Sequence, residues 1–232
     1  MLVTIFYAPT DSFRRLARPK WLVPLVASAI LALLGSVMVI SVVGMGNLTR
    51  MELAKRPALV EQLGHQQVDA FVAEAEQSTS RRYFSYASAF AATPLLTAFA
   101  AVTTLAGLLV FGAETTYSSV LTACAWGSYC ASVVTLAVSG LFLAVVDDYT
   151  IVDPQYMVAL NAGAFLDSAT TPPWVRALAS GFDLLAFGGM AIQCIGLTAL
   201  SSRVTRSQAL AVTITVHILW VLVKASWAAL LG

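Results

Sequence analysis

The sequence predicts an all-α fold, specifically a polytopic membrane helix bundle with five transmembrane helices. Of the 232 residues, 59% are hydrophobic and only 11% are charged. Soluble domains carry about 25% charged residues, more than twice this share. Mean hydropathy is +0.81, and long apolar runs recur along the chain. The composition therefore predicts one membrane domain that covers residues 1–232.

Five segments reach the length of about 20 apolar residues that a helix needs to cross a bilayer. These segments are residues 21–43, 85–111, 118–146, 174–200 and 207–231. The chain outside them consists of an N-terminal segment and two longer connections, namely 1–20, 44–84 and 147–173. The second and third segments follow each other closely enough to form a tight hairpin.

The distribution of charge predicts an orientation with the N-terminus inside and the C-terminus outside. Bases in short loops favour the cytoplasmic side of a membrane. The bases that precede the first span are Arg14, Arg15, Arg18 and Lys20. Arg203 and Arg206 follow the fourth span with no acid between them, so both regions are expected on the cytoplasmic side. The connection 147–173 has no base, and its acids are Asp147, Asp148, Asp153 and Asp167. We expect it outside, together with 44–84.

Residues 1–20 predict a short interfacial helix on the cytoplasmic face. Thr10 or Asp11 is a suitable N-cap for it. Such a helix lies at the headgroup level with its apolar side in the membrane and its bases toward anionic lipid. The apolar side chains available are Phe6, Tyr7, Phe13 and Leu16. The residues expected to anchor the segment to the lipid surface are Arg14, Arg15, Arg18, Lys20 and Trp21.

The connection 44–84 predicts an outer-face amphipathic helix from about Pro57 to Ala75. Its apolar residues recur at helical spacing, among them Leu59, Leu63 and Phe71. Because the five bases and five acids of this connection balance, we expect the helix to fold onto the bundle or to bind a partner. The connection 147–173 is long and acidic, and loops of that length often carry function.

The sequence contains none of the motifs that mark common enzymes. It has no zinc-protease HExxH, no G-x-S-x-G elbow, no Walker loop and no dinucleotide fingerprint. A net charge of +1 without a basic stripe gives no reason to expect nucleic acid. Cys124, Cys130 and Cys194 lie in apolar runs without metal-type spacing. We therefore predict no catalytic residue, no cofactor and no metal; a serine hydrolase that uses His65 or His217 is the least favoured alternative.

Ionisable and polar residues inside the predicted spans form the strongest physical signal, because such residues are costly in a bilayer and face protein or water. They are Asp183, Lys224, His217 and Gln193. Asp183 and Lys224 both lie roughly 10–14 Å below the outer surface, on helices expected to be antiparallel neighbours. We favour an interhelical ion pair over a substrate or proton path. Small residues that let the two helices approach each other are Gly181, Gly188 and Gly189.

Three stretches of the chain are distinctive in their order: the opening FYAPTDSFRRLARPKWLVPL, the later FGAETTYSSVLTACAWGSY, and GFDLLAFGGMAIQCIGLTALSSRVTRSQALAV. They resemble, in turn, the entry, the start of the third span and the penultimate-span signature of the bacterial branch of the YIP (Ypt-interacting protein) domain family of five-span membrane proteins. The resemblance implies a bacterial inner-membrane protein. Eukaryotic relatives bind small GTPases, but this chain lacks their long N-terminal region and D-L-Y-G-P-type motif.

Two functional hypotheses follow. The first is a non-enzymatic protein that binds other membrane proteins or copies of itself. The resemblance implies an accessory or assembly subunit, for example of a macrolide-efflux-type ABC exporter. Its contacts inside the membrane are expected at small residues, namely Ala98, Ala101, Gly127, Ser128 and Ala131. The alternative is a small transporter or channel with a polar path along Asp183, His217 and Lys224.

Overall fold

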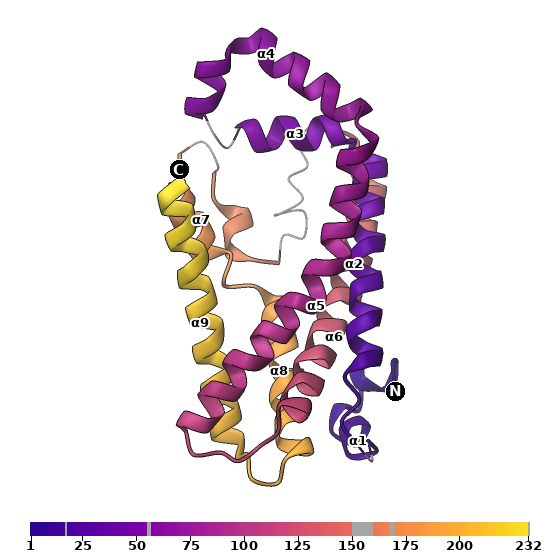
Figure 1. Cartoon of the computed structure of the whole chain (residues 1–232), viewed down its shortest axis with the longest axis vertical. Coiled ribbons are helices and arrows are strands. Elements are labelled where there is room, and N and C mark those ends of the chain that lie inside the picture. Colours follow the sequence, from indigo (N-terminus) through magenta and orange to yellow (C-terminus); the bar gives the residue numbers. More distant parts are fainter. Residues whose placement is uncertain (17, 55–56, 150–159, 168–169, 232) are drawn as a thin grey trace.

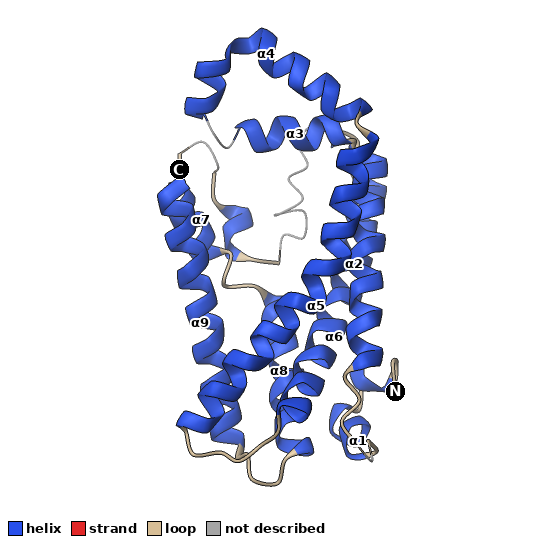
Figure 2. Cartoon of the chain, in the orientation of Figure 1, coloured by secondary structure: helices blue, strands red, loops and turns tan. Residues whose placement is uncertain are grey.

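The computed structural model is helical over 82% of the chain and contains no strand in the part that it describes (Figure 2). The described residues are 1–16, 18–54, 57–149, 160–167 and 170–231. The predicted all-α class is confirmed. Asp153, one of the acids predicted to mark the outer side, lies outside the described residues.

Four helices are long and apolar enough to cross a membrane. They are α2 (Leu22–Val43), α5 (Thr79–Val110), α6 (Tyr117–Val145) and α9 (Arg206–Leu231). Only 17% to 22% of the most apolar window of each helix is buried inside the chain. Large apolar faces thus remain exposed, and a lipid environment explains them. The structure supports a multi-pass membrane protein.

The predicted span 174–200 is not one continuous helix, and the prediction was wrong on this point. The chain forms a short helix α7 (Pro173–Ala179), leaves helical geometry at Ser180–Asp183, and resumes as α8 (Leu184–Leu200). α8 has 17 residues, slightly fewer than the roughly 20 that a bilayer requires. Hydropathy missed the interruption because the residues around it remain apolar.

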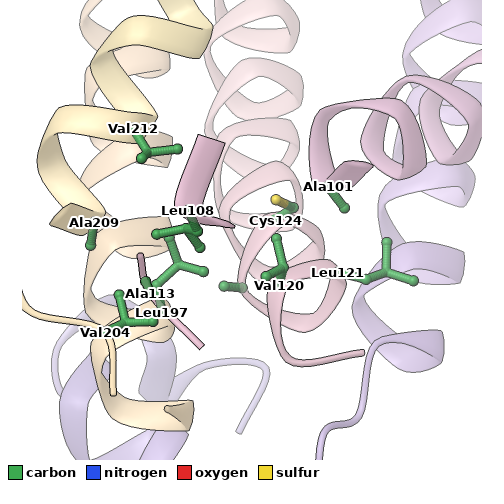
Figure 3. Close-up of a cluster of buried hydrophobic side chains, with 11 residues drawn as sticks. Ala101, Leu108, Ala113, Val120, Leu121, Cys124, Leu197, Val204, Ala209 and Val212 are labelled. Carbon is green, nitrogen blue, oxygen red and sulfur yellow. The ribbon is translucent and has the colours of Figure 1, made fainter. Parts of the chain in front are cut away.

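The connections between the helices lie at the two ends of the bundle (Figure 1). At the lower end lie α1 (Pro9–Arg14), the α5–α6 turn and the α8–α9 turn. At the upper end lie α3 (Met45–Ala54), α4 (Pro57–Gln77) and the C-terminus. A cluster of buried apolar side chains from α5, α6, α8 and α9 holds the lower half together (Figure 3). Trp126 and the N-terminal segment extend this core on the other side of α8.

The upper end is a helical hairpin made of α3 and α4. The predicted helix from Pro57 to Ala75 is confirmed as α4, although Gly64 interrupts it with a φ of 73°. Gly44, with a φ of 84°, lets the chain turn from α2 into α3, a helix that the sequence analysis did not predict. Val72 and Ala75 are buried against the hairpin, whereas Leu59 and Phe71 remain exposed.

The N-terminal segment folds into the bundle instead of lying only on the membrane surface. A 3-10 turn η1 (Thr4–Phe6) leads into α1, whose N-cap is Ala8 without a side-chain hydrogen bond. The predicted caps Thr10 and Asp11 are thus wrong, because Pro9 already starts the helix. Ile5 and Phe13 are completely buried in the cluster that contains Trp126.

Candidate functional site

The strongest concentration of intramembrane polar contacts surrounds the interruption between α7 and α8, residues 180–183, which we call the polar break. Its local sequence explains where both helices end. The Ser180 hydroxyl donates to the Ala177 carbonyl at 2.7 Å in the last turn of α7. Asp183 is the N-cap of α8, and its carboxylate accepts from the Leu185 amide at 2.8 Å. A capping carboxylate at this position stabilises a helix start.

The backbone groups freed by the break find partners on two other segments. The Phe182 carbonyl accepts from the Ala162 amide at 3.1 Å, and the Leu184 amide donates to the Leu160 carbonyl at 3.0 Å. These bonds pair Asn161 with Asp183 in a single antiparallel bridge. Residues 160–162 therefore cover the break and supply partners for its freed backbone groups.

α9 contributes the other two contacts. His217 Nε2 lies 2.9 Å from the Gly181 carbonyl, which gives the break a hydrogen bond to α9. Lys224 Nζ donates to the Ser180 hydroxyl at 3.2 Å. Two of the four predicted polar residues thus reach the segment that contains Asp183, but they bind its backbone and a serine.

The predicted ion pair between Asp183 and Lys224 is not formed in the described part of the chain. The prediction placed Asp183 on a continuous helix, where its side chain would point sideways toward α9. In the structure the helix starts at the next residue, and the carboxylate turns to the Leu185 amide. His217 and Lys224 nevertheless lie at the level of the break, where they contact Gly181 and Ser180.

Gln193 belongs to a separate polar site in the interior. It lies ten residues after Asp183, about 15 Å along α8. Its amide nitrogen donates to Thr104 Oγ1 and to Cys124 Sγ, each at 3.2 Å. Gln193 thereby links α8 to α5 and α6, not to α9, and the predicted cluster divides into two sites.

The three predicted packing glycines have different surroundings. A Cβ on Gly181 would lie 2.5 Å from a methyl group of Val221, so this glycine does bring the break against α9. Gly189 meets the backbone of Gly127 on α6, on a different side of α8 from the predicted one. A Cβ on Gly188 would meet nothing within 4 Å, so close packing does not require this glycine.

The close approach of α6 and α8 also corrects the prediction about partner contacts. A Cβ on Gly127 would lie 2.8 Å from the Gly189 carbonyl oxygen, and Ala101 is fully buried in the core. Ser128 lies 3.4 Å from the hydroxyl of Thr97 on α5. Ala101 and Gly127 are thus buried between helices of the same chain and are not free to contact another protein, whereas Ala98, Ser128 and Ala131 are only half-buried, and the prediction stays a prediction for them.

The predicted lipid anchor keeps its exposed bases. Arg14, Arg15, Arg18 and Lys20 are all exposed, and 36% of Trp21 is accessible at the start of α2. Further exposed aromatic residues mark the helix ends, with Phe111 and Tyr117 at the lower end and Tyr83, Phe84 and Trp227 toward the upper end. Aromatic belts of this kind mark the two membrane–water interfaces.

Sequence reasoning missed Asn161 and Ser180, which complete the break, and Gly196, which packs against Phe13 and Ala123. For Ser180 the signal was present, because Ser-Gly-Phe-Asp combines a turn glycine with a helix N-cap residue. No local signal marks Asn161, since its partner lies on another segment. Comparison of the chain with protein-family models, with curated proteins and with solved structures finds no match.

Proposed function

We propose that the chain crosses a bacterial cytoplasmic membrane five times, with α7, the polar break and α8 together forming the fourth crossing. The N-terminal segment and the C-terminus lie at opposite ends of the bundle, which supports an odd number of crossings (Figure 1). The bases before α2 and between α8 and α9 share the lower end. The positive-inside rule makes that end cytoplasmic.

The topology has a direct test. Single cysteines at Ser202 and Gln66, in a cysteine-free background, should react with a membrane-impermeant maleimide from opposite sides. In intact cells we expect labelling at position 66 and none at position 202 until the membrane is opened. Labelling at both positions in intact cells contradicts the five-crossing proposal.

We further propose that the protein is a non-enzymatic accessory or assembly subunit that binds another membrane protein, such as a macrolide-efflux-type ABC exporter, or a second copy of itself. The observation that carries this proposal is the α3–α4 hairpin, which projects from the bundle as a fixed platform. The Glu76 carboxylate accepts from the Gly46 amide and contacts Arg82 Nη2 at 3.3 Å, which ties α3, α4 and α5 together. A tied hairpin presents one surface without a large ordering cost on binding.

The exposed surface of the hairpin combines apolar residues with charged ones. Leu59 and Phe71 are 36% and 39% accessible, and Arg81 lies 4.4 Å from the centre of the Phe71 ring. Arg50 and Asp69 form an exposed ion pair between α3 and α4 at 3.4 Å. Apolar anchors with a charged rim are typical of sites that bind proteins.

The test compares purified wild-type protein with two matched variants in a mild detergent. Leu59→Gln/Phe71→Gln removes apolar surface from the hairpin, and Val110→Gln/Phe111→Gln removes exposed apolar surface at the opposite end. We expect the wild type and the Val110→Gln/Phe111→Gln variant to purify with an exporter subunit or as a dimer, and the hairpin variant to lose that partner. A wild-type protein that is monomeric and free of exporter subunits contradicts the proposal.

A small transporter or channel is the second candidate, and the polar break is the observation that favours it. Discontinuous membrane helices place binding sites near the midplane of many transporters. A flux assay in liposomes separates the two candidates. Transport that disappears in Asp183→Asn while helicity is retained would favour this candidate, whereas the accessory role predicts no flux in either protein.

A further inference from the structure

A cavity of about 470 Å³ lies at the lower end of the bundle, away from the polar break. Its walls come from three helices that are far apart in sequence. α1 contributes Thr10 and Arg14, α8 contributes Ile195 and Thr198, and α9 contributes Arg206 and Leu210. The volume falls in the range of about 300–1,000 Å³ that is usual for ligand sites.

The charge of the cavity is positive and uncompensated. Arg14 and Arg206 are both exposed, no acid lines the cavity, and neither guanidinium forms an ion pair within the described ranges. Arg203, on the same turn as Arg206, pairs with Glu114 from the α5–α6 turn. Of the nearby acids, Glu114 is paired with Arg203, and Asp11 of α1 does not line the cavity, so the two arginines of the cavity remain available for an anion. Paired arginines bind phosphate through short, charge-assisted hydrogen bonds.

A second part of the cavity wall is apolar. Ile195 and Leu210 lie on neighbouring transmembrane segments, and Leu210 is 54% accessible. The Thr198 hydroxyl bonds to the Cys194 carbonyl of its own helix, so it adds little polarity to this wall. An amphiphile with an anionic head and an apolar tail matches both walls.

We propose that this cavity binds one anionic phospholipid, with its phosphate between Arg14 and Arg206 and an acyl chain along Ile195 and Leu210. Basic pockets between membrane helices hold lipid headgroups in this manner. The site differs from general attraction to an anionic surface, which needs only exposed bases such as Arg15 and Arg18. The proposal requires a bilayer around the helices and is independent of the protein partner proposed above.

The bound lipid also fixes α1. Phe13 already packs α1 against Gly196 of α8, at ring-to-Cβ distances that leave no room for a side chain there. A phosphate shared by Arg14 and Arg206 adds a link from α1 to α9. The lipid thus joins the N-terminal segment to two helices at once.

The main test is native mass spectrometry of the full chain released from nanodiscs that contain equal amounts of phosphatidylglycerol and phosphatidylcholine. We expect the wild type to retain one phosphatidylglycerol. Arg14→Gln/Arg206→Gln should lower the retained fraction at least fivefold. The matched variant Arg15→Gln/Arg18→Gln removes the same charge from the surface outside the cavity and should retain the lipid. Equal loss in both variants, or equal retention of the two lipids by the wild type, overturns the proposal.

A second measurement uses the unaltered chain, so it does not depend on the folding of a variant. Cys194 lines the cavity, while Cys124 and Cys130 are buried in α6. Labelling of Cys194 by a maleimide, mapped by peptide mass spectrometry, should slow at least threefold in phosphatidylglycerol vesicles relative to phosphatidylcholine vesicles. Equal rates in both vesicles overturn the proposal. Equal protection by inorganic phosphate in phosphatidylcholine vesicles shows a site for a free anion and overturns the lipid assignment.

Discussion

α8 meets its neighbours in two different ways along its length. Against α6, the backbones of Gly127 and Gly189 touch, and apolar side chains fill the space around them. At its upper end, α8 begins at the polar break, where hydrogen bonds from α9 and from the segment after α6 provide the contacts. Lipid is as apolar as leucine, so membrane helices are held by close packing and by hydrogen bonds.

The two regions should respond differently to substitution. Close backbone contact depends on shape and tolerates no added atom. The polar break depends on particular donors and acceptors, and outside Gly181, which packs closely against Val221, it should tolerate side chains that preserve them. Five substitutions test this difference, each measured as the free energy of unfolding in mixed micelles titrated with sodium dodecyl sulfate.

The largest effect is expected for Gly127→Ala. The added methyl would lie 2.8 Å from the Gly189 carbonyl oxygen, a backbone atom that cannot rotate away. Overpacking of this kind costs about 1–3 kcal/mol, and we expect a value near the upper end because both surfaces are helix backbone.

Gly188→Ala is the matched control, because a Cβ there meets nothing within 4 Å. An alanine in a helix interior is favoured over glycine by about 0.5–1 kcal/mol, so this variant should be neutral or slightly stabilised. Equal destabilisation by the two substitutions contradicts the role given to Gly127.

An intermediate effect is expected for Asp183→Ala, which removes the N-cap of α8. Loss of such a cap costs about 1 kcal/mol. Asp183→Asn keeps an oxygen that can accept from the Leu185 amide and should cost less than about 0.5 kcal/mol. If Asp183→Asn lowered the free energy of unfolding as much as Asp183→Ala does, the stabilisation would come from the charge of the carboxylate. That result would contradict the capping role.

The smallest effect is expected for Lys224→Met. The ammonium is exposed and donates to a serine hydroxyl at 3.2 Å, and hydrogen bonds between membrane helices contribute about 0.6 kcal/mol on average. Breaking a buried ion pair would instead cost about 3–5 kcal/mol. If Lys224→Met lowered the free energy of unfolding by that larger amount, the result would support the originally predicted ion pair between Lys224 and Asp183.

The sequence predicted those parts of the fold that depend on composition and local periodicity. Hydropathy identified α2, α5, α6 and α9, and helical spacing identified α4 to within two residues at its C-terminal end. Hydropathy failed to predict the break at residues 180–183, because Gly181 and Phe182 keep the mean hydropathy high although the backbone leaves helical geometry there. Hydropathy measures transfer into lipid and carries no information about where hydrogen bonds along the helix stop.

The site was predicted less well, because its contacts depend on tertiary structure. Two residues of the predicted cluster, His217 and Lys224, do reach the segment around Asp183, where they contact the Gly181 carbonyl and the Ser180 hydroxyl. The partner predicted for the Asp183 carboxylate was wrong, because the sequence pattern was not recognised as the N-cap of α8. Gln193 was assigned to the same cluster from its depth alone, although the side of α8 that it occupies faces α5 and α6.

The polar break also has a consequence for the order in which the chain is assembled during synthesis. α7 and α8 leave the ribosome before α9, yet the imidazole that meets the Gly181 carbonyl belongs to α9. Without residues 206–231, the Gly181 carbonyl lacks the His217 imidazole and the Ser180 hydroxyl lacks the Lys224 ammonium. On the proposed five-crossing topology, α7 and α8 would therefore depend on α9 to satisfy the polar break inside the bilayer.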